Sequence, residues 1–323
     1  MSIGNNHSRF IFSRLFNAII KSDPLVLADA GARGELQYPW RGLKDSSVFV
    51  LGFEPDKEEC KKLNQQKVKN RIYLPTALWS LEGTINIHIS KNPGASSVYP
   101  PDMDFIKRYC GEHWEARITD KVVEVKCTTL DKVLEDRKSD CDFLKIDTQG
   151  SEFEILSGAA GSLKEKVFGV LVETWTSEVH KGQRLSGDIL VFMKNMGFSL
   201  FDINIAAAWR RRIEKNLKLF GKRQVIGLDF LFFKDADKFI EGEKKLSKVI
   251  KAAAISDVYG FPGYALELLN SANSMDNGIK TLKNIKDNII HNSLKQSRFY
   301  KKYIRALFKI LGVKNYDFPS LHY

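Results

Sequence analysis

The sequence has 323 residues, of which 43% are hydrophobic, 28% charged and 11% aromatic, and its formal net charge is +11. These values are typical of a folded chain with one large domain and an appendage, and they exclude a disordered, collagenous or coiled-coil protein. The four cysteines form no Cys-x-x-Cys pair, so we expect no zinc site and no disulfide framework, and a cytoplasmic location fits best. We find neither a secretion signal nor an apolar run long enough to span a bilayer.

Two segments account for the positive charge. Residues 209–223 carry seven basic side chains and one acid, and residues 294–315 carry seven basic side chains and no acid. Basic segments on a nearly neutral body predict a local contact with an anionic surface or substrate. Solvated helix faces are the alternative interpretation.

Short apolar runs bounded by turn residues recur through the first 235 residues and predict buried strands. The predicted core strands are residues 25–30, 48–53, 71–74, 143–146, 168–173, 198–203 and 227–233. Because the runs are continuously apolar, the sheet must be covered on both faces, so we predict an α/β fold with a doubly wound, mostly parallel, seven-stranded sheet. Residues 1–24 are expected to form an N-terminal helical segment, and residues 56–67 and 152–166 form helices between the strands.

An added β excursion is predicted in the long interval between the third and fourth core strands. Residues 84–89 and 122–127 alternate between apolar and polar side chains, as half-buried strands do. The loop 92–102 between them is rich in proline, glycine and serine and is suited to a lid.

After residue 234 the pattern becomes helical and rich in lysine, which predicts a basic helical extension over residues 235–323. Within it, apolar side chains recur at helical spacing over residues 299–311 with basic side chains between them, as in an amphipathic helix. In one interpretation the apolar stripe docks on the rest of the chain. In the other, the helix lies peripherally on an anionic membrane surface.

The first strand leads into a glycine turn, Asp29-Ala-Gly-Ala-Arg-Gly34. Gly31 and Gly34 let the backbone approach a ligand closely, as in nucleotide sites at the carboxyl ends of parallel strands. The carboxylate of Asp29 would repel a pyrophosphate but can accept hydrogen bonds from an ammonium group. This favours S-adenosylmethionine over NAD, with a tight turn that binds no ligand as the alternative.

The second strand ends in Gly-Phe-Glu54-Pro-Asp56. An acid at the tip of the strand beside the glycine turn is well placed to bind both hydroxyls of a ribose, and Glu54 is our candidate. The alternative is that Pro55 and Asp56 only begin a helix.

The fourth and fifth strands also end in acids, Asp147 and Glu173, and His180 follows the second of them. In a doubly wound sheet the fourth strand lies beside the first, so Asp147 should face the same crevice as Asp29. The alternative role of Asp147 is to cap the helix that follows it.

These motifs resemble the FkbM-type methyltransferase family. The resemblance covers about residues 25–234 and includes Asp-Ala-Gly-Ala-Arg-Gly, Gly-Phe-Glu-Pro-Asp and, most specifically, Leu-Lys-Ile-Asp-Thr-Gln-Gly-Ser-Glu-Phe-Glu-Ile-Leu at residues 144–156. It implies a class I, Rossmann-like methyltransferase domain over residues 25–234 that uses S-adenosylmethionine. The cofactor-binding residues that it implies are Asp29, Gly31, Ala32, Arg33, Gly34, Glu54, Pro55, Thr76, Ala77 and Asp147. Arg33 stands where many members carry asparagine.

The resemblance implies O-methylation of a hydroxyl on a glycan, a sugar or another small molecule. Because the methyl group of the cofactor is already activated, the remaining tasks are alignment and removal of a proton. Asp147 is the first candidate for the base, with Glu173 and His180 behind it, and no metal cluster is predicted. The alternatives are a nucleic-acid methyltransferase, which the missing Asn-Pro-Pro-Tyr motif disfavours, and a catalytically idle binding module.

Overall fold

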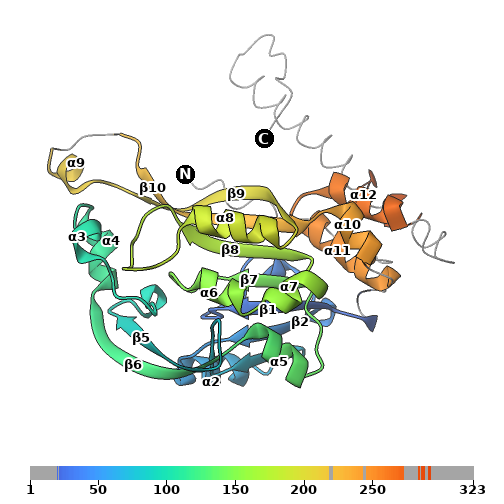
Figure 1. Ribbon diagram of the computed structural model, residues 1–323, viewed down its shortest axis with the longest axis horizontal. Helices are drawn as coiled ribbons and strands as arrows, with labels where there is room; N and C mark the ends of the chain where they lie inside the picture. Colours follow the sequence, from blue (N-terminus) through green and yellow to red (C-terminus); the bar gives the residue numbers. More distant parts are fainter. Residues whose placement is uncertain are drawn as a thin grey trace, which may run out of the picture.

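The computed structural model describes residues 20, 22–217, 221–242, 245–272, 283, 285–287 and 290–291. A seven-stranded sheet forms its centre, in the order β3-β2-β1-β7-β8-β10-β9 (Figure 1). The strands of this sheet are β1 (Leu25–Ala30), β2 (Val48–Phe53), β3 (Arg71–Leu74), β7 (Phe143–Ile146), β8 (Gly169–Trp175), β9 (Phe198–Trp209) and β10 (Gln224–Lys234).

The sheet is mostly parallel, as predicted. β1 pairs in parallel with both β2 and β7, so the fourth core strand lies directly beside the first. β10 is antiparallel to its two neighbours, β8 and β9. The predicted bounds of β1, β2, β3 and β7 are confirmed. β9 and β10 are longer than predicted, because the two strands continue as a hairpin in which Trp209 and Ile226 are buried in a separate apolar cluster.

Helices connect these strands and cover the sheet. They are α2 (Lys57–Gln65), α3 (Met103–Ile106), α4 (Gly111–Trp114), α5 (Leu130–Asp136), α6 (Glu152–Ser157), α7 (Ala160–Glu165), α8 (Ser186–Asn195), α9 (Arg212–Asn216), α10 (Ala236–Gly242), α11 (Leu246–Val258) and α12 (Pro262–Ser271). Short 3-10 turns are η1 (Trp40–Gly42), η2 (Asp45–Ser47), η3 (Pro93–Ala95) and η4 (Glu115–Arg117).

Two helix boundaries have clear local causes. α2 begins after Asp56, whose side chain accepts hydrogen bonds from the backbone amides of Glu58 and Glu59 and so caps the helix. The single helix predicted over residues 152–166 is two helices, α6 and α7. A Cβ atom at Gly158, between them, would lie 2.0 Å from the carbonyl oxygen of Trp79, so this close approach requires glycine.

The predicted β excursion forms a second, three-stranded sheet in the order β4-β6-β5. β5 (Gly83–Ser90) and β6 (Thr119–Thr128) are antiparallel and contain the two predicted runs. The short β4 (Ala77–Leu78) was not predicted, and it joins β6 in parallel at Cys127 and Thr128.

Two apolar cores lie on the two faces of the main sheet. On one face, α5 to α8 pack against alternate strand residues such as Leu144 and Val170, and Figure 1 shows α6, α7 and α8 in front of the sheet. On the other face, α10 to α12 and Trp40 pack against Leu27, Phe143 and Leu231. The helices after residue 234 therefore share a core with the sheet.

A buried ionic network also joins α11 to the sheet. Lys248 lies 2.7 Å from the Oδ1 atom of Asp142, and Lys251 lies 3.4 Å from its Oδ2 atom. The same Oδ2 atom accepts a hydrogen bond from the backbone amide of Val26, in β1. Asp142 precedes β7, so its carboxylate connects two central strands to α11.

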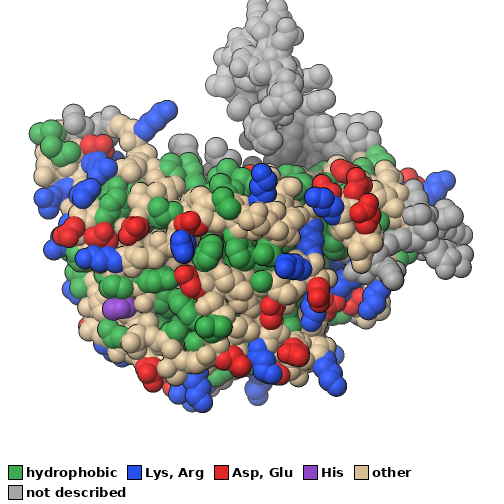
Figure 2. Space-filling view, viewed as in Figure 1, with side chains coloured by type: hydrophobic (Ala, Val, Ile, Leu, Met, Phe, Trp, Pro, Cys, Tyr) green, Lys and Arg blue, Asp and Glu red, His purple; other side chains and the backbone are tan. Residues whose placement is uncertain are grey.

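The first basic segment lies at the end of the β9–β10 hairpin. Of its described basic residues, Arg212 and Lys215 are on α9, and the others lie in the short segments that connect α9 to β9 and β10; Figure 2 shows Lys and Arg side chains gathered there. Residues 218–220, the segment 294–315 and the predicted amphipathic helix at 299–311 lie outside the described residues, as does nearly all of the segment 1–24. Among the described residues, no helix is both long and apolar enough to cross a membrane.

Candidate active site

A row of polar side chains interrupts the apolar face of the sheet near the carboxyl ends of its strands. We refer to Asp29, Lys145, Asp147, Glu173 and Asp229 as the polar row. Asp29 on β1 is in register with Lys145 on β7. Alternation along the strands places these two side chains on the face that carries Leu27 and Phe143. The Nζ atom of Lys145 lies 3.1 Å from Oδ1 of Asp29, and both side chains are almost completely buried. Burial is the largest single influence on the pKa of Lys145 and lowers it, but the carboxylates of Asp29, Asp147 and Glu173 together outweigh burial, so the net shift of this pKa is upward.

Three carboxylates follow at the next level of the same face. Asp147 lies just beyond the end of β7, and Glu173 on β8 is in register with Asp229 on β10. Gln149 donates a hydrogen bond of 2.6 Å to Glu173, and its amide nitrogen is 3.5 Å from Oδ1 of Asp147. Burial, followed by the charge of Asp147, raises the pKa of Glu173 well above its ordinary range and raises that of Asp229 to about 6.

Asp147 is partly accessible to solvent, with a side chain that is 33% exposed. Lys145 lies 3.7 Å from its Oδ2 atom, and Gln37 donates to the same oxygen at 3.4 Å. Among the described residues, no backbone amide of α6 donates to this carboxylate. Instead Glu152 binds the turn, accepting hydrogen bonds from the amides of Thr148 (3.1 Å) and Gly150 (2.9 Å). Asp147 is therefore available to a ligand.

The glycine turn after β1 fits closely against the end of β7. Gly31 has a φ of +79°, and a Cβ atom there would lie 2.1 Å from the carbonyl oxygen of Asp147. The amides of Gly31 and Ala32 both donate to the carbonyl oxygen of Phe53, at the end of β2. Only glycine permits this approach, which draws the ends of β1, β2 and β7 together.

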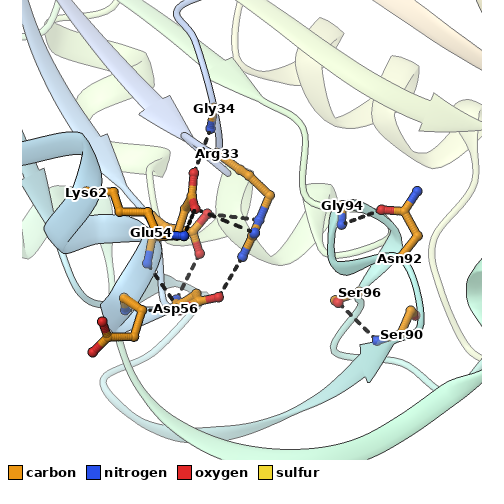
Figure 3. Close-up of polar contacts among 11 residues, drawn as sticks. Arg33, Gly34, Glu54, Asp56, Lys62, Ser90, Asn92, Gly94 and Ser96 are labelled. Atoms are coloured by element: carbon orange, nitrogen blue, oxygen red, sulfur yellow. Dashed lines mark hydrogen bonds and ion pairs between the residues drawn. The ribbon is translucent and has the colours of Figure 1, made fainter. Parts of the chain in front are cut away.

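Glu54 occupies the end of β2 and is 4% exposed. Its Oε1 atom accepts a hydrogen bond of 2.8 Å from the amide of Asp56, and its Oε2 atom lies 3.6 Å from Nε of Arg33. Arg33 also pairs with Asp56 at 2.8 Å, so its guanidinium group bridges the two acids (Figure 3). Burial raises the pKa of Glu54, and the opposing attraction of Arg33 is weaker.

One cavity of about 1240 Å³ runs along these strand ends to the added sheet. Six of the residues predicted from the sequence line it: Gly31, Arg33, Glu54, Pro55, Ala77 and Asp147. The loop expected to act as a lid contributes Pro93, Gly94, Ser96, Ser97 and Val98 to its wall. Figure 3 shows Arg33, Glu54 and Asp56 on one side and Ser90, Gly94 and Ser96 on the other.

The other predicted site residues are not among the described residues that line this cavity. They are Asp29, Ala32, Gly34, Thr76, Glu173 and His180. The Ala32 side chain packs with Cys60, Leu63 and Tyr73, and the Thr76 hydroxyl donates to the carbonyl oxygen of Lys126 at 3.1 Å. Asp29 and Glu173 belong to the polar row beside the cavity.

His180 has the least suitable surroundings for a base among the predicted candidates. Its side chain is 1% exposed, and its Nδ1 atom lies 3.1 Å from the side-chain oxygen of Gln183. Burial lowers the pKa of His180 to about 3, with a smaller contribution from Arg117. The imidazole is therefore uncharged at neutral pH, and it lies outside the cavity lining.

Sequence reasoning missed Lys145, Gln149, Asp229 and Gln37 as parts of the site. Lys145 precedes Asp147 by two residues in a strand, so alternation alone places both side chains on one face. Asp229 is likewise an acid inside an apolar run. No comparable signal exists for Gln37. Among the described residues, no group of three or more His, Cys, Asp or Glu side chains is arranged to hold a metal ion.

Comparison with known proteins identifies the family. The model of the methyltransferase FkbM domain matches residues 33–200. The chain belongs to the FkbM methyltransferase family. It is therefore an S-adenosylmethionine-dependent methyltransferase, as the motifs predicted, and its mostly parallel seven-stranded sheet confirms the predicted fold class.

Individual relatives of this FkbM-family chain share little sequence identity with it. The curated methyltransferase sdnD of Sordaria araneosa is 28% identical over 201 residues, which cover 54% of this chain and 77% of that protein. The solved methyltransferase FkbM of Methylobacillus flagellatus KT is 15% identical with a TM-score of 0.36, and the match covers 64% of this chain but only 44% of that one. Magnesium protoporphyrin IX methyltransferase from Synechocystis PCC 6803, solved with bound S-adenosylmethionine, is 10% identical with a TM-score of 0.34, covering 68% and 78% of the two chains.

Proposed function

We propose that this chain transfers a methyl group from S-adenosylmethionine to a hydroxyl group of a small-molecule acceptor, a class that includes sugars and glycans. One observation carries the proposal. The glycine turn after β1, Glu54 at the end of β2 and Asp147 at the end of β7 all line a single cavity. Ligands of open α/β sheets bind at the carboxyl ends of the strands, which is where these three features meet.

The residues of the cavity fit the cofactor. The turn at Gly31 presents backbone to the methionine end, because no side chain stands between it and the end of β7. Glu54 keeps one carboxylate oxygen, Oε2, that accepts no hydrogen bond among the described residues, and this oxygen is available to ribose hydroxyls. Pro55, Ala77 and Leu78 supply apolar surface beyond Glu54, where we place the adenine ring.

The chemistry required of the chain is modest. When bound, S-adenosylmethionine supplies an electrophilic methyl group, so the chain must align the acceptor oxygen and exclude water. Asp147 is the proposed base, because it lines the cavity whereas Glu173 and His180 do not. Lys145 and Gln37 contact its Oδ2 atom, whereas Gln149 approaches Oδ1 only to 3.5 Å, so Oδ1 is the oxygen better placed to accept the proton of the acceptor.

Transfer of labelled methyl groups tests this function. The wild-type chain is incubated with methyl-labelled S-adenosylmethionine and, in separate reactions, with a small-molecule extract of its source cells, with RNA and with DNA. We expect label in the small-molecule fraction as an alkali-stable methyl ether. Label in nucleic acid alone would instead support the nucleic-acid alternative, and no label in any fraction would support an idle binding module.

A further inference from the structure

An aliphatic ladder faces the cavity from the added sheet. Ile85 pairs with Val125 and Ile87 pairs with Val123 across β5 and β6, so their side chains lie on one face. All four residues line the cavity. Val122 points to the opposite face of the same strand and is 52% exposed. We refer to Ile85, Ile87, Val123 and Val125 as the aliphatic ladder.

The cavity is larger than one ligand requires. Pockets for drug-sized ligands measure roughly 300 to 1,000 Å³, whereas this cavity has about 1240 Å³. We place the cofactor at the strand ends around Gly31 and Glu54, and the ladder forms the wall contributed by the other sheet. The ladder therefore bounds space that remains for a second molecule.

The lining indicates the chemistry of that molecule. Aliphatic side chains that face a cavity gain free energy when an apolar group displaces water from them. Phe53 is the single aromatic residue among the described residues of the lining, and it is 1% exposed, so the cavity offers no ring on which a sugar could stack. Beside the ladder, Lys121 and Lys126 alternate with Asp120 and Glu124, so β6 contributes no net charge to the lining.

We propose that the ladder is the acceptor site, and that the acceptor is an uncharged molecule with an apolar body. The apolar body lies against Ile87 and Val123, and the hydroxyl group that is methylated points toward Asp147. This inference rests on the proposed function and narrows its acceptor class from small molecules in general to apolar ones.

A neutral apolar dye tests the site without knowledge of the natural acceptor. The fluorescence of N-phenyl-1-naphthylamine is titrated with the full chain, alone and with saturating S-adenosylhomocysteine. Val123→Thr and Val125→Thr keep the shape of the ladder but place a hydroxyl group in it. Val122→Thr makes the same change on the opposite face and is the matched control. Thermal unfolding curves identify any variant that is not folded.

We expect saturable binding that S-adenosylhomocysteine does not displace. Each ladder variant should bind the dye about five- to tenfold more weakly, because the new hydroxyl group loses water without gaining a partner, and Val122→Thr should bind as the wild type does. Absence of saturable binding, displacement by S-adenosylhomocysteine, or equal affinity in all variants would overturn the proposal. Calorimetry measures the binding of S-adenosylhomocysteine in the absence of the dye. If the wild type does not bind S-adenosylhomocysteine, the proposed function is contradicted, and not only the acceptor site.

Discussion

Lys145 shows how a single buried charge organises the site. Its ammonium group lies between Asp29, at 3.1 Å, and Asp147, at 3.7 Å, in the centre of the sheet. Removing one member of a buried ion pair leaves the other charge without compensation, which costs more than the pair itself contributes.

We therefore expect Lys145→Met to lower the free energy of unfolding by about 3 kcal/mol. The double variant Asp29→Asn/Lys145→Met should recover much of this loss, because the buried charge of Asp29 is removed as well and the remaining partner, Asp147, is partly exposed to solvent. Urea denaturation of the three proteins measures both effects. A Lys145→Met variant as stable as the wild type would show that Asp29 does not depend on this partner.

The carboxylate of Asp147 is the residue on which the proposed chemistry depends. Asp147→Asn preserves its shape and removes the base, so we expect the rate of methyl transfer to fall about a hundredfold or more, while the affinity for S-adenosylhomocysteine changes little. Single-turnover kinetics with an acceptor found by methyl labelling measures the first quantity, and calorimetry measures the second. Asp136→Asn, on the exposed side of α5, is the control. An Asp147→Asn variant with the full rate would exclude this residue as the base.

At the scale of elements, the contribution of the turn between β7 and α6 to the stability of the fold depends on pH. Glu152 is fully buried within this turn, and burial raises its pKa to about 7, although the amides of Gly150 and Thr148 oppose the shift. A carboxyl group whose pKa is raised on folding contributes stability below its unfolded pKa, near 4.5, and this contribution is lost as the pH rises through 7.

Glu152→Gln remains neutral at every pH and keeps an acceptor for the two amides. We expect the stability of the wild type relative to this variant to fall by about 3 kcal/mol between pH 4.5 and pH 7.5. Urea denaturation across this range measures the difference, and Glu165→Gln, at an exposed position on α7, is the control. A constant difference across the range would mean that Glu152 titrates normally.

Strands with continuous apolar runs could be predicted from the sequence. Lys145 and Asp229, the polar residues that interrupt two of these runs, were not recognised as parts of the site. The predicted bounds of β1 and β2 are those of the structure, because both strands are buried on two faces. β4 has only two residues and pairs with β6 through tertiary contact, so no local pattern could predict it. Alternation along β7 could have indicated Lys145, but the position of Asp229 beside Glu173 required the order of β8 and β10 in the sheet, which the sequence does not contain.

At the scale of the whole molecule, the helices after residue 234 complete the fold. Residues of α11 and α12 such as Val249, Ile255 and Leu268 are completely or almost completely buried against the strands. The sequence predicted these helices as an extension, because nothing in their own pattern indicates which surface they cover.

We expect a chain that ends at Lys234 to lack cooperative unfolding, since one face of its sheet would be bare. A chain that ends at His291 keeps the described residues of this core and should unfold cooperatively. Circular dichroism during thermal unfolding compares the two. Cooperative unfolding of the shorter chain would show that residues 25–234 form an independent domain.

We propose that the cavity at the ends of β1, β2 and β7 binds S-adenosylmethionine, with Glu54 on the ribose. Calorimetric titration with S-adenosylhomocysteine tests it most directly in the wild type, Glu54→Gln and the exposed control Glu165→Gln. Loss of a charge-assisted hydrogen bond worth roughly 1.5 to 3 kcal/mol should weaken the binding to Glu54→Gln about ten- to a hundredfold, and the control should bind as the wild type does. A wild type that binds no S-adenosylhomocysteine, or a Glu54→Gln variant of equal affinity, would contradict the claim.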